Sequence, residues 1–222
     1  MYRELIAGFS LSILSGLTVS PSMAVEDEVR GLMLIIEQRM ADPAARQEAM
    51  RAGSNRALLC SYCHGRDGNS VKPEVPNLAG QNPVYLLDQI NKFARGEREN
   101  FVMNSLARDF TLDDKVNLAI YYANQEVRQQ AANEQLAETG RHLYTQQCAS
   151  CHGRQGRGTT EYARLAGQQP EYVKMTLTRF RNNANSPQAD SSSARRSPIM
   201  ESIVATLSDE QLEALAAYVA GL

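Results

Sequence analysis

Apolar residues recur every three to four positions along most of this chain, which is the spacing that places them on one face of an α-helix. The clearest case begins at Pro83, in the first-turn position that proline favours, and continues through Leu86, Ile90 and Phe93. No stretch of useful length alternates apolar and polar residues in the manner of a β-strand. The pattern therefore predicts an all-α fold.

Several sequence segments of the first half of the chain occur again in the second half. CSYCHGRDGN from Cys60 matches CASCHGRQGR from Cys148 at an offset of 88 positions, and PNLAGQNPVYL from Pro76 matches ARLAGQQPEYV from Ala163 at 87. A later pair, FTLDDKVNLAIYYA and LSDEQLEALAAYVA, is offset by 97. Such self-similarity indicates two copies of one structural unit. The ten extra residues of the second copy fall in the polar segment 182–197, which predicts a surface loop.

The helices of the two copies are expected to correspond. Pro170 opens the counterpart of the Pro83 helix, and the last helix of each copy begins after Thr111 or Ser208, the latter with a capping box to Gln211. The expected buried positions of these helices, apart from those given above, are Val173, Leu177, Phe180, Leu118, Tyr121, Tyr122, Leu215, Tyr218 and Val219.

The N-terminus has the pattern of a secretory signal peptide. An apolar run spans residues 5–19, and Ser22 and Ala24 are the small residues that precede a cleavage site. Cleavage after Ala24 would release a soluble, exported chain. The alternatives are an uncleaved anchor and a buried N-terminal helix, although the run is shorter than the roughly 20 residues that span a bilayer.

Five parts follow from these patterns: a signal peptide (1–24), a helical extension (25–52), a first domain (53–123), a polar linker (124–133) and a second domain (134–222). In the extension, Asp42 and Pro43 restart a helix. An apolar stripe precedes them, which we expect to pack on the first domain or else to dock a partner. It consists of Val29, Leu32, Met33, Ile36 and Met40.

Composition narrows the function classes. The 222 residues carry a formal net charge of −2, which is unlike the basic surface that nucleic-acid binding needs. A hydrophobic content of 43% is sufficient for packed cores. Four cysteines are too few for a disulfide-stapled scaffold, so their placement carries the information.

All four cysteines and two of the three histidines lie in C-x-x-C-H motifs, the attachment signature of c-type haem. Two thiols on one helical turn can form thioethers with one haem, and the next histidine can ligate its iron. A Cys₄ zinc site would need the two cysteine pairs closer together in the sequence. A thioredoxin-like site would not require the two histidines, and no βαβ pattern surrounds the motifs. The third histidine, His142, is expected at the surface. The motif residues are Cys60, Cys63 and His64, and Cys148, Cys151 and His152.

A second axial ligand decides between electron transfer and catalysis. Met103, in the expected loop before the last helix, is the single methionine after His64 in the first copy. Met200 lies 97 positions later, at the offset of the last helices, whereas Met175 has no equivalent and is expected at the surface. The repeat thus favours Met103 and Met200 as ligands over the core-filling role that methionine often has.

These motifs, together with both LAGQ-x-P-x-Y segments, resemble the dihaem class I cytochromes c, of the cytochrome c4 type. The resemblance covers nearly the whole mature chain and implies two cytochrome c-fold domains about a pseudo-twofold axis, with electrons passing between two covalent haem c groups. It also implies a periplasmic carrier that serves respiratory oxidases or reductases. In that family a backbone carbonyl near the Pro76 position receives the proton of the ligand imidazole, and Ala163 replaces this proline in the second copy.

The favoured function is accordingly one-electron transfer without a substrate, nucleic acid or catalytic residue. Its partners would be redox proteins, some of them membrane-bound. The alternative is a dihaem electron-transfer subunit of a periplasmic dehydrogenase such as a flavocytochrome c, which the extension 25–52 keeps open. A dihaem peroxidase would need an iron that can lose its sixth ligand, and the two methionines argue against it.

Overall fold

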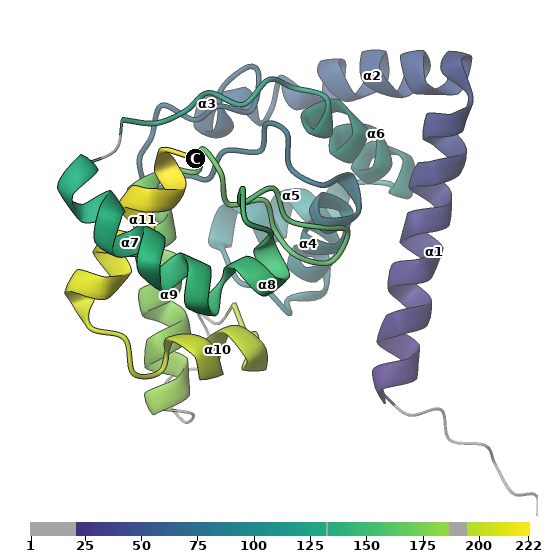
Figure 1. Cartoon of the computed structure of the whole chain (residues 1–222). Helices are drawn as coiled ribbons and strands as arrows, with labels where there is room; N and C mark the ends of the chain where they lie inside the picture. The colour runs from purple at the N-terminus through teal and green to yellow at the C-terminus, as the bar shows by residue number, and fades with distance from the viewer. Residues whose placement is uncertain (1–20, 132, 187–194) are drawn as a thin grey trace, which may run out of the picture.

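A computed structural model describes residues 21–131, 133–186 and 195–222, and within them the chain is built from helices joined by turns and loops (Figure 1). The apolar run 5–19, most of the expected signal peptide and positions 187–194 of the polar segment lie outside the described residues. No described helix combines the length and hydrophobicity that crossing a membrane requires. In chain order the helices are α1 (Pro21–Ala41), α2 (Pro43–Ala57), α3 (Ser61–His64), α4 (Pro83–Arg95), α5 (Phe101–Asp109), α6 (Leu112–Ala123), α7 (Glu134–Gln147), α8 (Ala149–His152), α9 (Pro170–Asn185), α10 (Pro198–Val204) and α11 (Asp209–Ala220).

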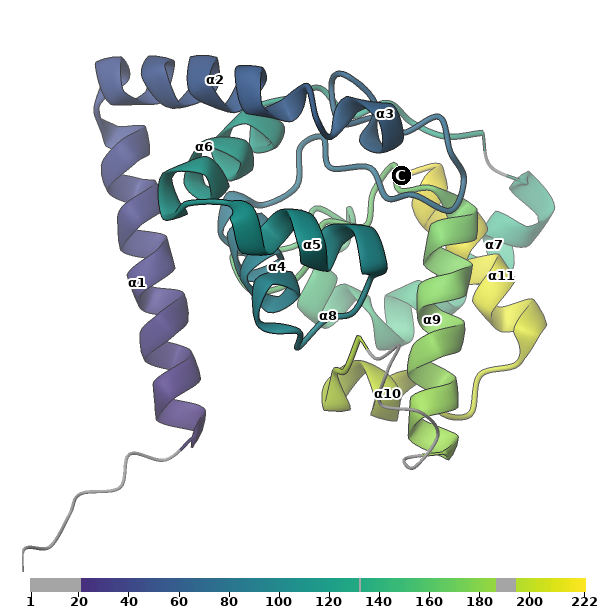
Figure 2. The ribbon, with the colours of Figure 1, turned by 180° about the vertical axis from the view of Figure 1, so that it is seen from behind.

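Two separate hydrophobic cores confirm the repeat. The first is built on α2, α4 and α6, around the fully buried Leu87 and Ile120, and the second on α7, α9 and α11, around Tyr144 and Leu212. The helices α2 and α6 pack together in the first unit as α7 and α11 do in the second. Figures 1 and 2 show the two units side by side, with α1 on the edge of the molecule away from the second unit.

In each unit a glycine allows two packed helices, α2 and α6 or α7 and α11, to approach each other closely. A Cβ at Gly53 in α2 would lie 2.3 Å from the carbonyl oxygen of Asn117 in α6. A Cβ at Gly140 in α7 would lie 2.0 Å from the carbonyl oxygen of Ala214 in α11. Any larger residue would push these helices apart, because 3.0 Å is already closer than real Cβ contacts come. The two glycines therefore fix the same helix crossing in both units.

The helix starts follow the sequence signals with one exception. The side chain of Asn82 accepts hydrogen bonds from the first turn of α4, and Thr111 and Ser208 form capping boxes on α6 and α11. Gln169 occupies the cap position of α9 but makes no such bond. Its amide instead donates to the carbonyl of Ser70 in the first unit, so this residue serves the contact between the units.

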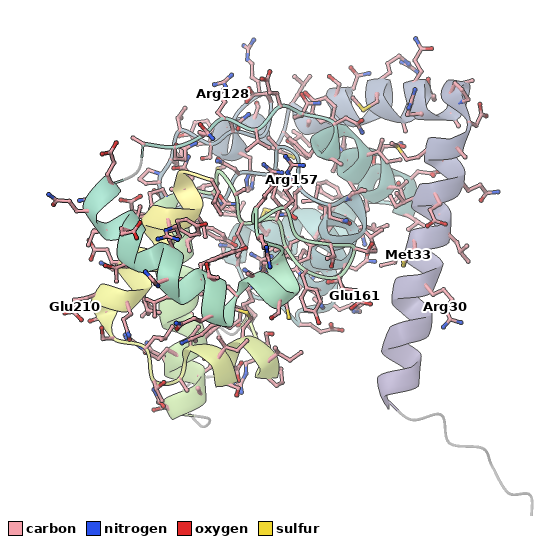
Figure 3. All side chains as sticks on the ribbon, in the orientation of Figure 1. Arg30, Met33, Arg128, Arg157, Glu161 and Glu210 are labelled. Carbon is pink, nitrogen blue, oxygen red and sulfur yellow. The ribbon has the colours of Figure 1, made fainter. Side chains whose placement is uncertain are left out.

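The extension packs on the first unit. Leu32 and Ile36 are buried in the first core, as the apolar stripe predicts. Figure 3 shows Met33 directed from α1 toward that unit and Arg30 directed away from it. Asp42 caps α2, and residue 52, the end of the expected extension, lies within this helix. The helix that packs on α6 thus begins inside the segment assigned to the extension.

A pair of glutamines joins the two units with matching hydrogen bonds. The Gln168 side chain accepts from the Asn77 N–H (2.7 Å) and donates to the Asn77 carbonyl (3.0 Å). Gln81, its equivalent in the repeat, accepts from the Arg164 N–H (2.7 Å) and donates to the Arg164 carbonyl (3.0 Å). These reciprocal pairs give the interface the pseudo-twofold relation that the family resemblance implies.

Replacing Gln168 with alanine should destabilise the chain by about 2–3 kcal/mol, because both main-chain polar groups of the buried Asn77 lose their partner. Gln81→Ala should have a similar cost at Arg164. Denaturant unfolding measures both. Gln146→Ala, on the exposed surface of α7, is the control and should change the stability by less than about 0.5 kcal/mol. A cost at Gln168 no larger than at Gln146 would contradict this role of the glutamine pair.

Candidate haem-binding site

Each C-x-x-C-H motif forms one tight turn after the first helix of its unit. The motif histidines end the short helices α3 and α8, and the N–H groups of His64 and His152 donate to the carbonyls of Cys60 and Cys148, both at 2.9 Å. This turn keeps the two cysteines and the histidine of a motif on one short stretch of helix. The four cysteines are free of disulfides and half-buried.

The two histidines are held in the same way. His64 Nδ1 lies 2.9 Å from the carbonyl oxygen of Pro76, and His152 Nδ1 lies 2.8 Å from that of Ala163. The expected carbonyl contact is thus present in the second unit despite the change from proline to alanine. When Nδ1 donates to a carbonyl, the proton is fixed there and Nε2 is left free to bind a metal.

Burial prepares these imidazoles for ligation. Each histidine has only 8% of its surface exposed. Burial lowers the pKa of His64 and that of His152, because the charged imidazolium is poorly solvated inside the protein. Both side chains are therefore neutral at pH 7, which is the form that coordinates iron.

The thiols do not match a redox-active or zinc-binding pair. Burial raises the pKa of Cys60, and it raises that of Cys148 to about 11. Catalytic dithiols instead have a lowered pKa, because the thiolate is the reactive form. Within the described part of the chain, no three His, Cys, Asp or Glu side chains converge in the manner of a metal-ion site. A neutral histidine beside two thiols on one turn fits covalent haem c.

The two expected methionine ligands occupy equivalent places, but not in loops. Met103 lies in the first turn of α5 and Met200 in that of α10, so the prediction of a loop at Met103 is wrong. Asn100 and Ser197 cap these helices by accepting hydrogen bonds from the N–H groups of Met103 and Met200. Both methionines are half-buried, and Met200 packs against the second core.

His142 and Met175, neither of which is an expected ligand, differ in their exposure. His142 is exposed on α7, as predicted. Met175 lies on α9 and is half-buried, so it is only partly at the surface. It does not share the helix face of Val173 and Phe180, the buried residues of α9.

Two arginine–tyrosine contacts at the interface were missed by sequence reasoning. Arg98 donates to the hydroxyl of Tyr172 (2.9 Å), and Arg195 donates to that of Tyr85. Burial disfavours ionisation of Tyr172, but the charges of Arg98 and Arg195 outweigh it and lower the pKa of this phenol to about 8. The repeat could have indicated these residues. The two arginines are 97 positions apart, like the methionines, and the two tyrosines are 87 positions apart, like the LAGQ segments.

Comparison with known proteins places this arrangement in a family. A family model for cytochrome c matches residues 137–222. Cytochrome c4 of Azotobacter vinelandii is 36% identical over 190 residues, which cover 77% of this chain and 88% of that protein. This chain belongs to the cytochrome c4 family. The cytochrome c4 of Pseudomonas aeruginosa is 34% identical and covers 77% of this chain and 87% of its own length.

A solved cytochrome c4 has the same two-unit architecture. The reduced recombinant cytochrome c4 from Pseudomonas stutzeri superposes with a TM-score of 0.68 at 30% identity, and the match covers 78% of this chain and 97% of that one. The all-α, two-domain cytochrome c fold expected from the sequence is thereby confirmed. Cytochromes c4 are dihaem electron-transfer proteins rather than enzymes, and the two C-x-x-C-H motifs fit two covalent haem c groups.

Proposed function

We propose that this cytochrome c4 is a periplasmic carrier that takes single electrons from one respiratory redox protein and passes them to another. Covalent attachment is assigned to Cys60 and Cys63 in the first domain and to Cys148 and Cys151 in the second. The axial ligands are assigned as His64 with Met103 and as His152 with Met200. When bound in this way, haem supplies a reversible Fe(III)/Fe(II) couple whose potential a thioether ligand raises.

The observation that supports this proposal is that the same kind of hydrogen bond holds both imidazoles. Nδ1 of His64 and of His152 is occupied by a carbonyl at 2.9 and 2.8 Å, so in both domains Nε2 is the nitrogen left for iron. A capped first turn presents a methionine at the same repeat position of each domain. Two centres with matching ligands favour a carrier with two similar potentials.

Two half-buried arginines, Arg98 and Arg195, are candidates for binding the negatively charged propionates of haem. Among the described residues, Arg98 and Arg195 form no ion pair with a carboxylate, and their partners are neutral. Burial lowers the pKa of Arg98, as expected for a cation without a counter-ion. We assign these guanidiniums to the carboxylates of the haem propionates, which would neutralise charge on both sides of the domain interface.

The compartment and the domain limits rest on the sequence. Residues 1–24 have the pattern of a signal peptide, and haem attachment would then follow export. We propose domain limits of 53–123 and 134–222, joined by the linker 124–133. The two hydrophobic cores and the non-helical course of residues 125–131 support this division.

Electron exchange between the two centres is the test of this function. We expect a rapidly mixed reductant to reduce one centre first and the electron then to equilibrate with the other at a rate independent of protein concentration, because Gln81 and Gln168 hold the domains together. The Met103→His variant makes the centres optically distinct for this measurement. Two independent reductions, with no exchange between the centres, would show that the domains act as separate carriers.

A dehydrogenase subunit remains a second candidate. The cytochrome subunit of a sulfide dehydrogenase from Chlorobaculum tepidum is 32% identical over 84 residues, which is 38% of this chain. The half of α1 whose side chains the structure describes also exposes Leu34, with 60% of its surface accessible. Stable co-purification with a flavoprotein would favour this candidate, whereas isolation of the cytochrome alone at physiological salt favours the free carrier.

A further inference from the structure

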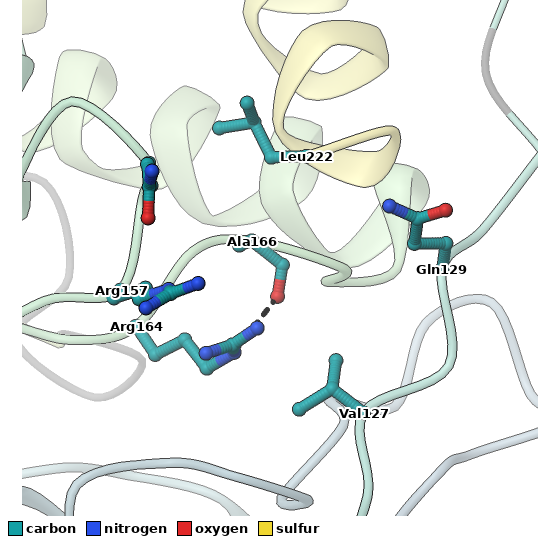
Figure 4. A pocket seen from close by; sticks show the side chains of 7 residues that line it. Val127, Gln129, Arg157, Arg164, Ala166 and Leu222 are labelled. Carbon is teal, nitrogen blue, oxygen red and sulfur yellow. Dashed lines mark hydrogen bonds between the residues drawn. The ribbon is translucent and has the colours of Figure 1, made fainter.

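A cleft of about 490 Å³ lies where the linker meets the second domain, outside the proposed haem ligands. Figure 4 shows Arg157 and Arg164 side by side with their guanidinium groups directed into it. The other lining residues are Val127 and Gln129 of the linker, with Gln155, Ala166 and Leu222 of the second domain. The side chains that line the cleft thus supply hydrogen-bond donors and positive charge, and no carboxylate side chain is among them.

The position of Arg164 is fixed by the domain interface. Its main-chain N–H donates a hydrogen bond to the Gln81 side chain of the first domain, and its main-chain carbonyl accepts one from the same side chain. Its Nε donates to the carbonyl of Ala166 (3.2 Å), which leaves the two terminal nitrogens of the guanidinium for another acceptor. Val127 fills the bends at Gly80 and Gly167, where a Cβ would come within 2.4 and 2.6 Å of its methyl groups.

The two guanidiniums of the cleft form no ion pair with the described residues. The salt bridges of that part of the chain involve other arginines and lysines. Burial and the charge of Arg157 lower the pKa of Arg164, which is the expected effect of a like charge that no carboxylate neutralises. An anion between the two side chains would remove this repulsion and accept paired N–H bonds from each.

We propose that this cleft binds a phosphate-class oxyanion between Arg157 and Arg164, with the amides of Gln129 and Gln155 as further donors. Two adjacent guanidiniums favour a doubly charged tetrahedral anion over a monovalent carboxylate, because each can engage its own pair of oxygens. A bound anion would contact both the linker and the second domain, so it would also stabilise the junction between the domains.

Calorimetric titration of the full dihaem protein with inorganic phosphate tests the proposal, and acetate at equal ionic strength is the comparison anion. We expect one saturable site that binds phosphate at least about tenfold tighter than acetate. Phosphate should also raise the temperature of thermal unfolding. Arg157→Gln should weaken phosphate binding about tenfold without affecting the fold, because Arg157 is exposed.

Arg154→Gln is the matched control, since Arg154 is an exposed arginine of the same loop that does not line the cleft. This variant should bind phosphate as the parent does. No saturable binding, equal affinity for acetate, or an equal loss in Arg154→Gln and Arg157→Gln would each overturn the proposal. The visible spectrum should stay unchanged throughout, which separates this site from the assignment of the haem ligands.

Discussion

Met103→His should lower the midpoint potential of one haem by on the order of a tenth to a few tenths of a volt, because an imidazole stabilises Fe(III) better than a thioether does. The far-red absorption band that is diagnostic of methionine bound to Fe(III) should fall to half its amplitude in the same protein. Potentiometric titration followed by optical spectra measures both quantities. The second haem should keep its potential, because its own ligands are unchanged.

The repeat supplies the matched variants for this experiment. Met200→His should affect the other haem in the same way, because Met200 lies in the first turn of α10 as Met103 lies in that of α5. Met175→Leu is the control and should leave both potentials and the far-red band unchanged. A loss of the band in Met175→Leu, or unchanged potentials in Met103→His, would show that the alignment of the ligands between the domains is wrong.

Removal of both thiols of the second motif, Cys148→Ala with Cys151→Ala, should halve the haem content and greatly reduce the thermal stability of the second domain. A domain of this size is marginal without its cofactor, because a small chain buries a modest share of its surface. A cofactor that binds the folded state also shifts the folding equilibrium toward that state. Haem absorbance per chain and calorimetric unfolding provide the two measurements.

The corresponding change in the first domain, Cys60→Ala with Cys63→Ala, is the comparison. It should also leave one haem per chain, this time on the second motif. Retention of two covalent haems in either double variant would mean that the attachment sites are elsewhere. A second domain that keeps its full stability without haem would contradict the proposed dependence of folding on the cofactor.

The parts of the fold that the sequence predicts are those set by local rules. Leu86 and Phe93 recur at helical spacing and are buried, and Thr111 and Ser208 cap the helices that they were expected to begin. His64 and His152 could be identified from the C-x-x-C-H motifs, because covalent haem attachment fixes the spacing between the two cysteines and the histidine. Each of these features depends on a few neighbouring residues, which a single sequence displays.

The features that were missed depend on contacts between distant residues or on very short elements. The helices that carry Met103 and Met200 span nine and seven residues, too few for periodicity to separate them from a loop. Gln81 and Gln168 were seen as part of a repeat, but their partners lie 83 and 91 positions away in the other domain. A polar residue that satisfies a buried backbone across an interface leaves no periodic trace in the sequence.

Intact mass spectrometry of the mature protein, with mapping of the haem-bearing peptides, tests the central assignment most directly. We expect one chain with two covalent haem groups, one on the peptide that contains Cys60 and Cys63 and one on the peptide that contains Cys148 and Cys151. A chain that carries one haem or none, or both haems on one peptide, would contradict it.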